Sequence, residues 1–327
     1  MKKLLKKIKH FTKSMQNFYH AGTKKDVAHG AIRIALRHPS DFYRKLKWKK
    51  IRKNFHEENI KLNLEKFDIL VMNNDDGIAA ELAVDKMHEP YGTEILLSII
   101  QDNMTVVDLG ANIGYYVLQQ ATHKNLEKII AIEPNPVSFE CLKKNIDLNN
   151  LKNVDTYNIA ISDTDGTCPF YISKISNICS ITPKTDYEKI ISVPVTKLDS
   201  FVKKYKIKNV DLVRMDIEGH EVHAIRGMLN TLKTKKPWIC MEYHSPMIDD
   251  KQRNELIQML DDVEYELKAY TFRWVDYPIF GKTIADTKSI IKHENLKTLL
   301  NISDRQTLLL FLAHKDKTFT PPKLIHR

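Results

Sequence analysis

The chain of 327 residues is long enough for a large hydrophobic core, and its 43% hydrophobic and 28% charged residues exclude wholesale disorder. No apolar run reaches the ~20 residues that a membrane-spanning helix requires. The net charge of +10 arises in residues 1–60, which hold 17 Lys and Arg against 4 Asp and Glu, so it says little about the partners of the rest. Four cysteines without a CxxC pair indicate reduced thiols in a cytoplasmic protein.

Residues 1–60 are predicted to form a basic, helical extension. Five apolar residues recur there at steps of four and three: Leu4, Ile8, Phe11, Met15 and Phe18. One apolar stripe among lysines is typical of a helix that lies on an anionic membrane surface, here the inner one, or that docks on its own protein. A second basic stretch, residues 44–53, surrounds Trp48 and either contacts the phosphates of lipid or nucleic acid or forms a solvated helical face. Both pairs of alternatives stay open.

Residues 61–315 alternate between short apolar runs and helical patterns, and residues 316–327 are expected to form a tail. Strands are predicted at residues 67–72, 104–109, 128–133, 154–161, 211–215 and 238–242, with a closing antiparallel pair at 265–269 and 307–312. Helices are predicted at residues 95–100, 113–123, 138–149, 198–205, 221–232 and 254–260. This alternation predicts an α/β fold with a doubly wound, mostly parallel sheet. A hairpin at residues 167–173 and 190–195 interrupts it and is expected to project as a lid or substrate platform.

The first strand of the core leads into a glycine turn, Asp108-x-Gly110-x-x-x-Gly114. The spacing is not that of a GxGxxG turn, and no Lys-Ser/Thr pair follows Gly114 as a P-loop requires. An acid at the strand end disfavours a pyrophosphate but suits the ammonium group of S-adenosylmethionine, whose carboxylate can bind N–H groups at the helix start. Glu133 ends the next strand, where it can accept from ribose hydroxyls. Asp163 ends the third strand, where it can accept from the adenine amino group.

Residues 88–244 resemble the FkbM family of S-adenosylmethionine-dependent methyltransferases. The resemblance rests on Val107–Tyr116, Ile132–Pro136, Asn158–Asp163, Val195–Asp199 and, most specifically, Leu212–Glu221. Arg214 stands where the family commonly has Lys, which keeps the charge. The resemblance implies a seven-stranded, Rossmann-like class I methyltransferase sheet and, usually, O-methylation of a sugar or other small-molecule hydroxyl. It implies as cofactor-binding residues Asp108, Gly110, Asn112, Gly114, Glu133, Pro134 and Asp163.

Four candidate catalytic residues follow the fourth and fifth strands: Asp216, Glu218, His220 and His244. Methyl transfer from a sulfonium needs alignment, and a hydroxyl acceptor benefits from a general base, a role that the sequence assigns to none of the four. A histidine in such a place is more often a structural hydrogen-bond partner than a base. No spacing here is a metal signature, so no metal is expected. A hard-metal site made of Asp216, Glu218, Glu242 and His244 is the alternative.

The expected acceptor is a glycan, a lipid-linked sugar or another small molecule. An RNA or other nucleic-acid methyltransferase that binds through the basic extension is the main alternative. Against it, no Asn-Pro-Pro-Tyr-type segment follows the fourth strand, where methylation of a base amino group calls for one. A third interpretation is a membrane-surface binding protein whose fold has lost activity. The three strand-end acids Asp108, Glu133 and Asp163 argue against that loss.

Overall fold

The computed structural model describes Arg44 and residues 46–173, 179–183, 187–273, 295–302, 307–320 and 322. The apolar stripe predicted between Leu4 and Phe18 lies outside the described residues, and so does half of the predicted tail. Within the described part of the chain, no helix combines the length and the apolarity needed to cross a membrane.

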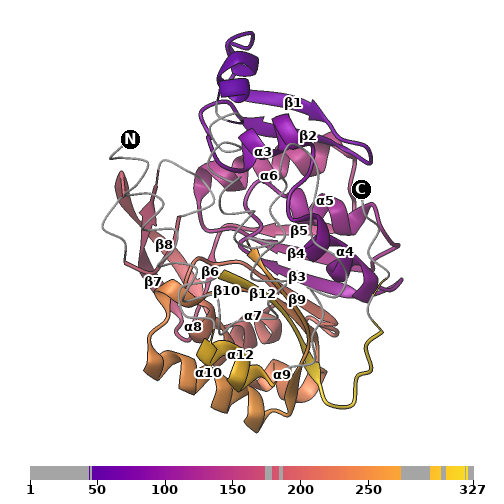
Figure 1. Ribbon diagram of the computed structural model, residues 1–327, viewed down its shortest axis with the longest axis vertical. Coiled ribbons are helices and arrows are strands. Elements are labelled where there is room, and N and C mark those ends of the chain that lie inside the picture. The colour runs from indigo at the N-terminus through magenta and orange to yellow at the C-terminus, as the bar shows by residue number, and fades with distance from the viewer. Residues whose placement is uncertain are drawn as a thin grey trace, which may run out of the picture.

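A seven-stranded sheet forms the centre of the molecule (Figure 1). Its strands are β3 (Thr105–Leu109), β4 (Lys128–Ile132), β5 (Val154–Tyr157), β9 (Leu212–Met215), β10 (Trp238–His244), β11 (Tyr265–Phe272) and β12 (Thr307–His314). They lie in the order β11-β12-β10-β9-β3-β4-β5, and only β12 runs antiparallel to both of its neighbours. The doubly wound, mostly parallel fold and its closing antiparallel pair are therefore confirmed.

Helices cover both faces of the sheet, which explains why its central strands are buried throughout. Every residue of β3, β9 and β10 is buried. One face carries α4 (Pro90–Ile99), α5 (Tyr115–Ala121) and α6 (Pro136–Leu148). The other carries α7 (Leu198–Lys204), α8 (Glu221–Arg226), α9 (Leu229–Lys235), α10 (Asp250–Asp262) and α12 (Leu296–Ile302) (Figure 1). The single helix predicted over residues 221–232 is wrong, because the chain leaves the helix at Gly227 and starts a second one at Leu229.

The third strand is shorter than the apolar run over residues 154–161 predicts. β5 ends at Tyr157, and the amide of Asn158 donates to the backbone oxygens of Glu133 and Pro134 at 2.8 and 3.0 Å. These bonds hold the chain in a bend, after which β6 (Ala160–Ile161) joins a separate sheet. Asp163 therefore follows β6 and does not end a strand of the main sheet.

That separate sheet has three strands in the order β6-β8-β7, with β7 at Gly166–Ile172 and β8 at Lys189–Thr196. Antiparallel pairing of β7 with β8 confirms the predicted hairpin. A small apolar core of its own includes Phe170 and Val193. The sheet projects beside the main one, at the left of Figure 1, and brings Phe170 to the edge where the parallel strands end.

The N-terminal side of the domain is a further layer. β1 (Asn59–Asn63) pairs with β2 (Asp68–Met72), and α3 (Ile78–Asp85) follows them. The boundary expected between residues 60 and 61 therefore falls inside β1. In the second basic stretch, Trp48 is fully buried in the main core and Arg44 forms an ion pair with Asp85. The aromatic part of this stretch therefore packs on the protein itself.

Candidate functional site

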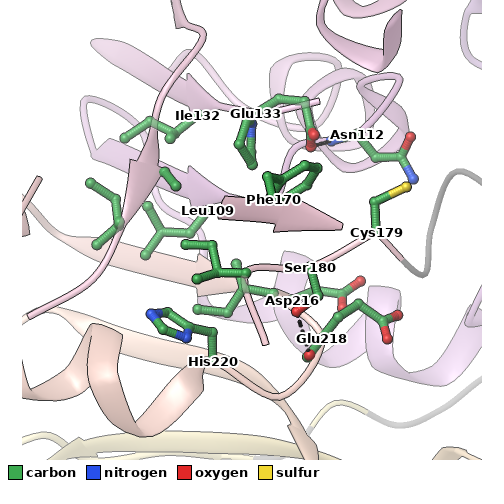
Figure 2. A pocket seen from close by; sticks show the side chains of 16 residues that line it. Leu109, Asn112, Ile132, Glu133, Phe170, Cys179, Ser180, Asp216, Glu218 and His220 are labelled. Carbon is green, nitrogen blue, oxygen red and sulfur yellow. Dashed lines mark hydrogen bonds between the residues drawn. The ribbon is translucent and has the colours of Figure 1, made fainter. Parts of the chain in front are cut away.

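A pocket lies at the carboxyl ends of β3, β4 and β9, where the strand order changes direction. In open α/β sheets this switch point is the usual ligand site. Seven of the predicted site residues line the pocket: Gly110, Asn112, Glu133, Pro134, Asp216, Glu218 and His220. Figure 2 shows Glu133 and Asn112 on one side of it and Asp216 and Glu218 on the other. Asp108, Gly114, Asp163 and His244 lie outside the lining.

The glycine turn brings two strand ends together. The N–H groups of Gly110 and Ala111 both donate to the backbone oxygen of Ile132, at 2.9 and 3.0 Å, so the turn folds over the end of β4. Gly110 has φ +79°, and a Cβ there would lie 2.0 Å from the backbone oxygen of Asp216. Only glycine allows this approach. Gly114 is the N-cap of α5, and a Cβ on it would lie 2.7 Å from the side chain of Leu142, so the absence of a side chain allows α5 and α6 to pack closely.

Glu133 is fixed by the backbone around it. Its carboxylate accepts from the N–H groups of Asn112 and Asn135, at 2.7 and 2.8 Å. Burial nevertheless raises the pKa of Glu133 to about 7. Each carboxylate oxygen has two lone pairs, so both retain capacity to accept from a diol such as a ribose. The Oδ1 atom of Asn112 is buried without a hydrogen-bond partner among the described residues, and it is available to a ligand donor.

Asp108 lies behind the pocket and is fully buried. Its carboxylate accepts from Arg214 at 3.2 Å and from Gln120 at 3.3 Å. Arg214 also donates to the backbone oxygen of Gly110 and to Asp216, both at 3.1 Å. The guanidinium carbon lies 4.2 Å from the ring centroid of Tyr116. Arg214 thus ties the glycine turn to the end of β9. Asp108 binds Arg214 there, although burial outweighs the effect of Arg214 and raises the pKa of Asp108.

The carboxylate of Asp163 is bound by two side chains of α8, His223 and Arg226. Burial acts to raise its pKa, but hydrogen bonds from His223 and Arg226 outweigh burial and lower that pKa to about 2. The neighbouring Ser162 instead faces the pocket residue His220, with 2.8 Å between Oγ and Nε2. Burial and the nearby His223 lower the pKa of His220 to about 4, so its ring is neutral at physiological pH. The role of Asp163 at the adenine therefore stays a prediction, and its visible contacts are with the protein.

Four carboxylates and one imidazole meet beside the pocket, and we call this group the acidic cluster: Asp216, Glu218, Glu221, Glu242 and His244. The Nδ1 atom of His244 lies 2.8 Å from Glu221. Its Nε2 atom lies 3.9 Å from Asp216, 3.8 Å from Glu218 and 3.9 Å from Glu242. The structure thus brings together Asp216, Glu218 and His244, three of the four candidate catalytic residues, which follow two different strands in the sequence.

Burial and neighbouring charges raise the pKa of some groups in the acidic cluster and lower the pKa of others. Burial and the carboxylates of Asp216 and Glu89 hold the pKa of Glu242 well above its usual range. Burial would lower the pKa of His244, but Glu221 and the other carboxylates raise it well above the ordinary value. Asp216 would also be raised by burial, but Arg214 lowers its pKa. The site therefore favours a positive charge among these carboxylates, and a neutral His244 that acts as general base is disfavoured.

Sequence reasoning missed the part of the pocket wall that the small sheet supplies. Phe170 on β7 and residues 179–181 line the pocket, and Ser180 donates from Oγ to the backbone oxygen of Glu218 at 2.8 Å. Figure 2 shows Phe170 between the Glu133 side and the Asp216 side. The only feature of the sequence that pointed to this wall was the predicted hairpin. The pattern of apolar and polar residues along its strands did not reveal which side chains face the pocket. The pairing of Arg273 with Glu89, 3.0 Å apart, was also missed.

These residues fit S-adenosylmethionine. The carboxylate at Glu133 suits ribose hydroxyls, the unpartnered Asn112 oxygen suits a polar donor, and the apolar Phe170 and Ile161 suit a base. The acidic cluster on the opposite side suits positive charge.

A family model described as Methyltransferase FkbM domain matches residues 108–274, just over half of the chain. The hexuronic acid methyltransferase AglP of Haloferax volcanii is 27% identical over 163 residues, which cover 50% of this chain and 65% of AglP. The 2-O-methyltransferase NoeI of Sinorhizobium fredii is 24% identical over 166 residues, which cover 46% of this chain and 67% of NoeI. The crystal structure of Methyltransferase FkbM from Methylobacillus flagellatus KT aligns with 69% of this chain and 49% of that chain, at 15% identity and a TM-score of 0.40.

The alignment thus spans slightly less than two thirds of AglP. The family match itself begins at Asp108 and contains the glycine turn, Glu133 and the acidic cluster. On this evidence the chain belongs to the FkbM methyltransferase domain family, whose cofactor is S-adenosylmethionine.

Proposed function

We propose that the protein transfers the methyl group of S-adenosylmethionine to a hydroxyl of a sugar or another small molecule. The observation that carries this proposal is the position of Asp216 and Glu218 across the pocket from Glu133 (Figure 2). A cofactor whose ribose is bound at Glu133 extends toward these two acids. The names of two relatives support the acceptor class, since AglP is a hexuronic acid methyltransferase and NoeI is a 2-O-methyltransferase.

The residues of the pocket have separable roles in this proposal. Glu133 and Asn112 bind and orient the cofactor, and Phe170 excludes water from its base. The cofactor supplies a methyl group made electrophilic by a sulfonium. Asp216 and Glu218 hold the acceptor hydroxyl in line with that methyl group, which is the main requirement of a displacement at carbon. The new C–O bond forms as the C–S bond breaks, the electron pair stays on sulfur, and the hydroxyl proton passes to the acidic cluster.

A nucleic-acid acceptor has less support. The basic stretch around Trp48 was one reason to consider it. The Trp48 side chain is buried in the core, however, and cannot stack on a base. The acids that follow β9 also suit a hydroxyl with a proton to lose, whereas a phosphate backbone would be repelled by the acidic cluster. The apolar stripe over residues 4–18 is a separate proposal, for an anionic lipid surface. A variant that lacks residues 1–20 tests it, because the buried Trp48 is retained: loss of co-sedimentation with phosphatidylglycerol vesicles is expected, and equal co-sedimentation would contradict it.

Two measurements test the proposed function. Calorimetry is expected to show one S-adenosylmethionine site per chain, with binding weakened at least tenfold by Glu133→Ala. Transfer of a labelled methyl group is then followed with fractionated cell extract and with uronic-acid-terminated oligosaccharides. Label that is released by glycosidases, and not by nucleases, supports a sugar acceptor. Absence of cofactor binding, or label that only nucleases release, would overturn the proposal. Asp216→Asn is expected to lose turnover more than cofactor affinity.

A further inference from the structure

The acidic cluster has the composition and spacing of a site for a divalent cation. One ligand atom each from Asp216, Glu218 and His244 lies within 4.8 Å of the others. Two ligand atoms on one ion lie about 3 Å apart when adjacent and about 4.2 Å apart when opposite, if the bonds are about 2.1 Å long. The separations of 3.8 to 3.9 Å between His244 Nε2 and the carboxylate oxygens fall between these limits. Glu242 lies at the same distance as the other two acids.

The orientation of His244 is an independent sign of a ligand. Its side chain is 9% exposed, and its Nδ1 atom is bonded to Glu221. Its Nε2 atom has no partner within hydrogen-bond distance among the described residues, and it points to the space between three carboxylates. A histidine that binds a metal commonly has this arrangement, in which a carboxylate holds one ring nitrogen and leaves the other for the ion.

A second unpartnered atom belongs to Asp216. One of its oxygens, Oδ2, accepts from Arg214. The other, Oδ1, is buried and has no hydrogen-bond partner in the described part of the chain, and it lies 3.9 Å from the Nε2 atom of His244. A buried polar atom left without a partner is costly unless a ligand binds it. Glu242 is 10% exposed, and its closest recorded cation, Arg273, is 3.6 Å away and also binds Glu89.

We propose that Asp216, Glu218 and His244 bind a divalent cation of the Mn²⁺ or Mg²⁺ class, with Glu242 as a fourth ligand and Glu221 as the group that orients His244. Carboxylate oxygens select these hard ions, and one imidazole is compatible with Mn²⁺. The geometry that supports the metal site does not depend on the proposed methyl transfer; only the role given to the ion rests on it. The ion holds the oxygen of the acceptor hydroxyl beside the cofactor and makes its proton easier to remove. An acceptor with two neighbouring oxygens, such as a sugar diol or uronic acid, matches this site best.

Mn²⁺ alone is the probe, because the paramagnetic resonance signal of the free ion disappears when it binds. Protein is first treated with EDTA and then freed of chelator. One Mn²⁺ per chain is expected in the absence of any other ligand. Glu218→Gln and His244→Gln are expected to weaken binding at least tenfold. His223→Gln is the matched control, since it changes an imidazole on α8 outside the acidic cluster, and it should bind as wild type does. Melting curves confirm that each variant is folded. Mn²⁺ should raise the melting temperatures of wild type and His223→Gln, but not those of Glu218→Gln and His244→Gln.

Three results would overturn the metal site. The first is a Mn²⁺ signal that stays free with or without S-adenosylmethionine. The second is equal weakening by His223→Gln and Glu218→Gln. The third is release of bound Mn²⁺ when S-adenosylmethionine is added, which would assign the acidic cluster to the cofactor's ammonium group. Calorimetry with S-adenosylmethionine in EDTA is run in parallel. Cofactor binding without Mn²⁺ binding would refute the metal site alone, whereas loss of both would also refute the proposed function.

Discussion

The guanidinium of Arg214 donates to the carboxylate of Asp108 across 3.2 Å, and the two side chains are 5% and 0% exposed. The sequence suggested that Asp108 meets the ammonium group of the cofactor. Its carboxylate is instead directed at a guanidinium that also contacts Gly110 and Asp216. We therefore expect Asp108 to act on the pocket through Arg214, by fixing the ends of the two strands that border the switch point.

Asp108→Asn should lower the free energy of unfolding by about 3 kcal/mol, because a buried guanidinium loses one of its two carboxylates. Denaturant unfolding followed by circular dichroism measures this change. Glu242→Gln is the matched control, since burial and neighbouring acids already hold the pKa of that carboxyl well above its usual range, and its stability should change little. The support role would be contradicted if Asp108→Asn unfolded like wild type while its cofactor affinity fell tenfold or more.

We expect Glu133 to make cofactor binding depend on pH. Its pKa is about 7, so the group is largely protonated at pH 6 and ionised at pH 8. Ribose hydroxyls donate to the ionised form, so affinity should rise with pH through this window and level off above it. The gain is at most about tenfold per pH unit. Methylthioadenosine is the ligand to use in calorimetry, because it contains the ribose and base but lacks the α-amino group of S-adenosylmethionine, which would titrate in the same range.

Glu133→Gln is the control for this dependence. The amide keeps the shape and one acceptor oxygen but cannot ionise, so its affinity should be lower and flat between pH 6 and pH 8. A wild-type profile that is itself flat, or a Glu133→Gln profile that still rises with pH, would assign the titration to another group.

Gly110→Ala should disrupt the pocket. The new Cβ would meet the backbone oxygen of Asp216 at 2.0 Å, and neither strand end can move without breaking the bonds of Arg214. A loss of about 2 to 4 kcal/mol in stability is expected, with cofactor affinity reduced below detection. Gly166→Ala separates the steric effect from backbone strain, because that glycine also has positive φ but faces open space. It should cost about 1 to 2 kcal/mol and leave cofactor affinity intact. Equal effects of both substitutions would contradict the steric argument.

The sequence was sufficient to predict those parts of the site that depend on residues close together along the chain. The turn from Gly110 to Gly114 and the position of Glu133 follow from a strand, a helix and a second strand in succession. Contacts between distant segments were not predictable in the same way. Arg214 and Asp108 are 106 residues apart and face each other only because β9 pairs with β3. The bend at Asn158 depends on hydrogen bonds to the backbone after β4, which no apolar pattern encodes.

The same bend determines where Asp163 lies. An acid at the end of the third strand would lie beside the adenine, but Asp163 follows β6 and its carboxylate is bound by His223 and Arg226. Arg226 is held in turn by Glu255 at 2.8 Å. These contacts connect the chain after β6 to α8 and α10. We therefore expect Asp163 to shape the pocket wall that contains Ser162 and His220, rather than to contact the cofactor directly.

A double-mutant cycle distinguishes the two roles. If Asp163 acts through Arg226, then Asp163→Ala and Arg226→Ala should each raise the Kd for methylthioadenosine by a similar small factor, and the double variant should be no worse than either single one. Their coupling in stability should be about 1 kcal/mol or less, since both side chains are partly exposed. A direct contact with adenine predicts another pattern: Asp163→Ala alone would raise the Kd tenfold or more, and Arg226→Ala would bind as wild type does. Calorimetry on the four proteins decides between the patterns, because only the first makes the effect of Asp163 vanish once Arg226 has been removed.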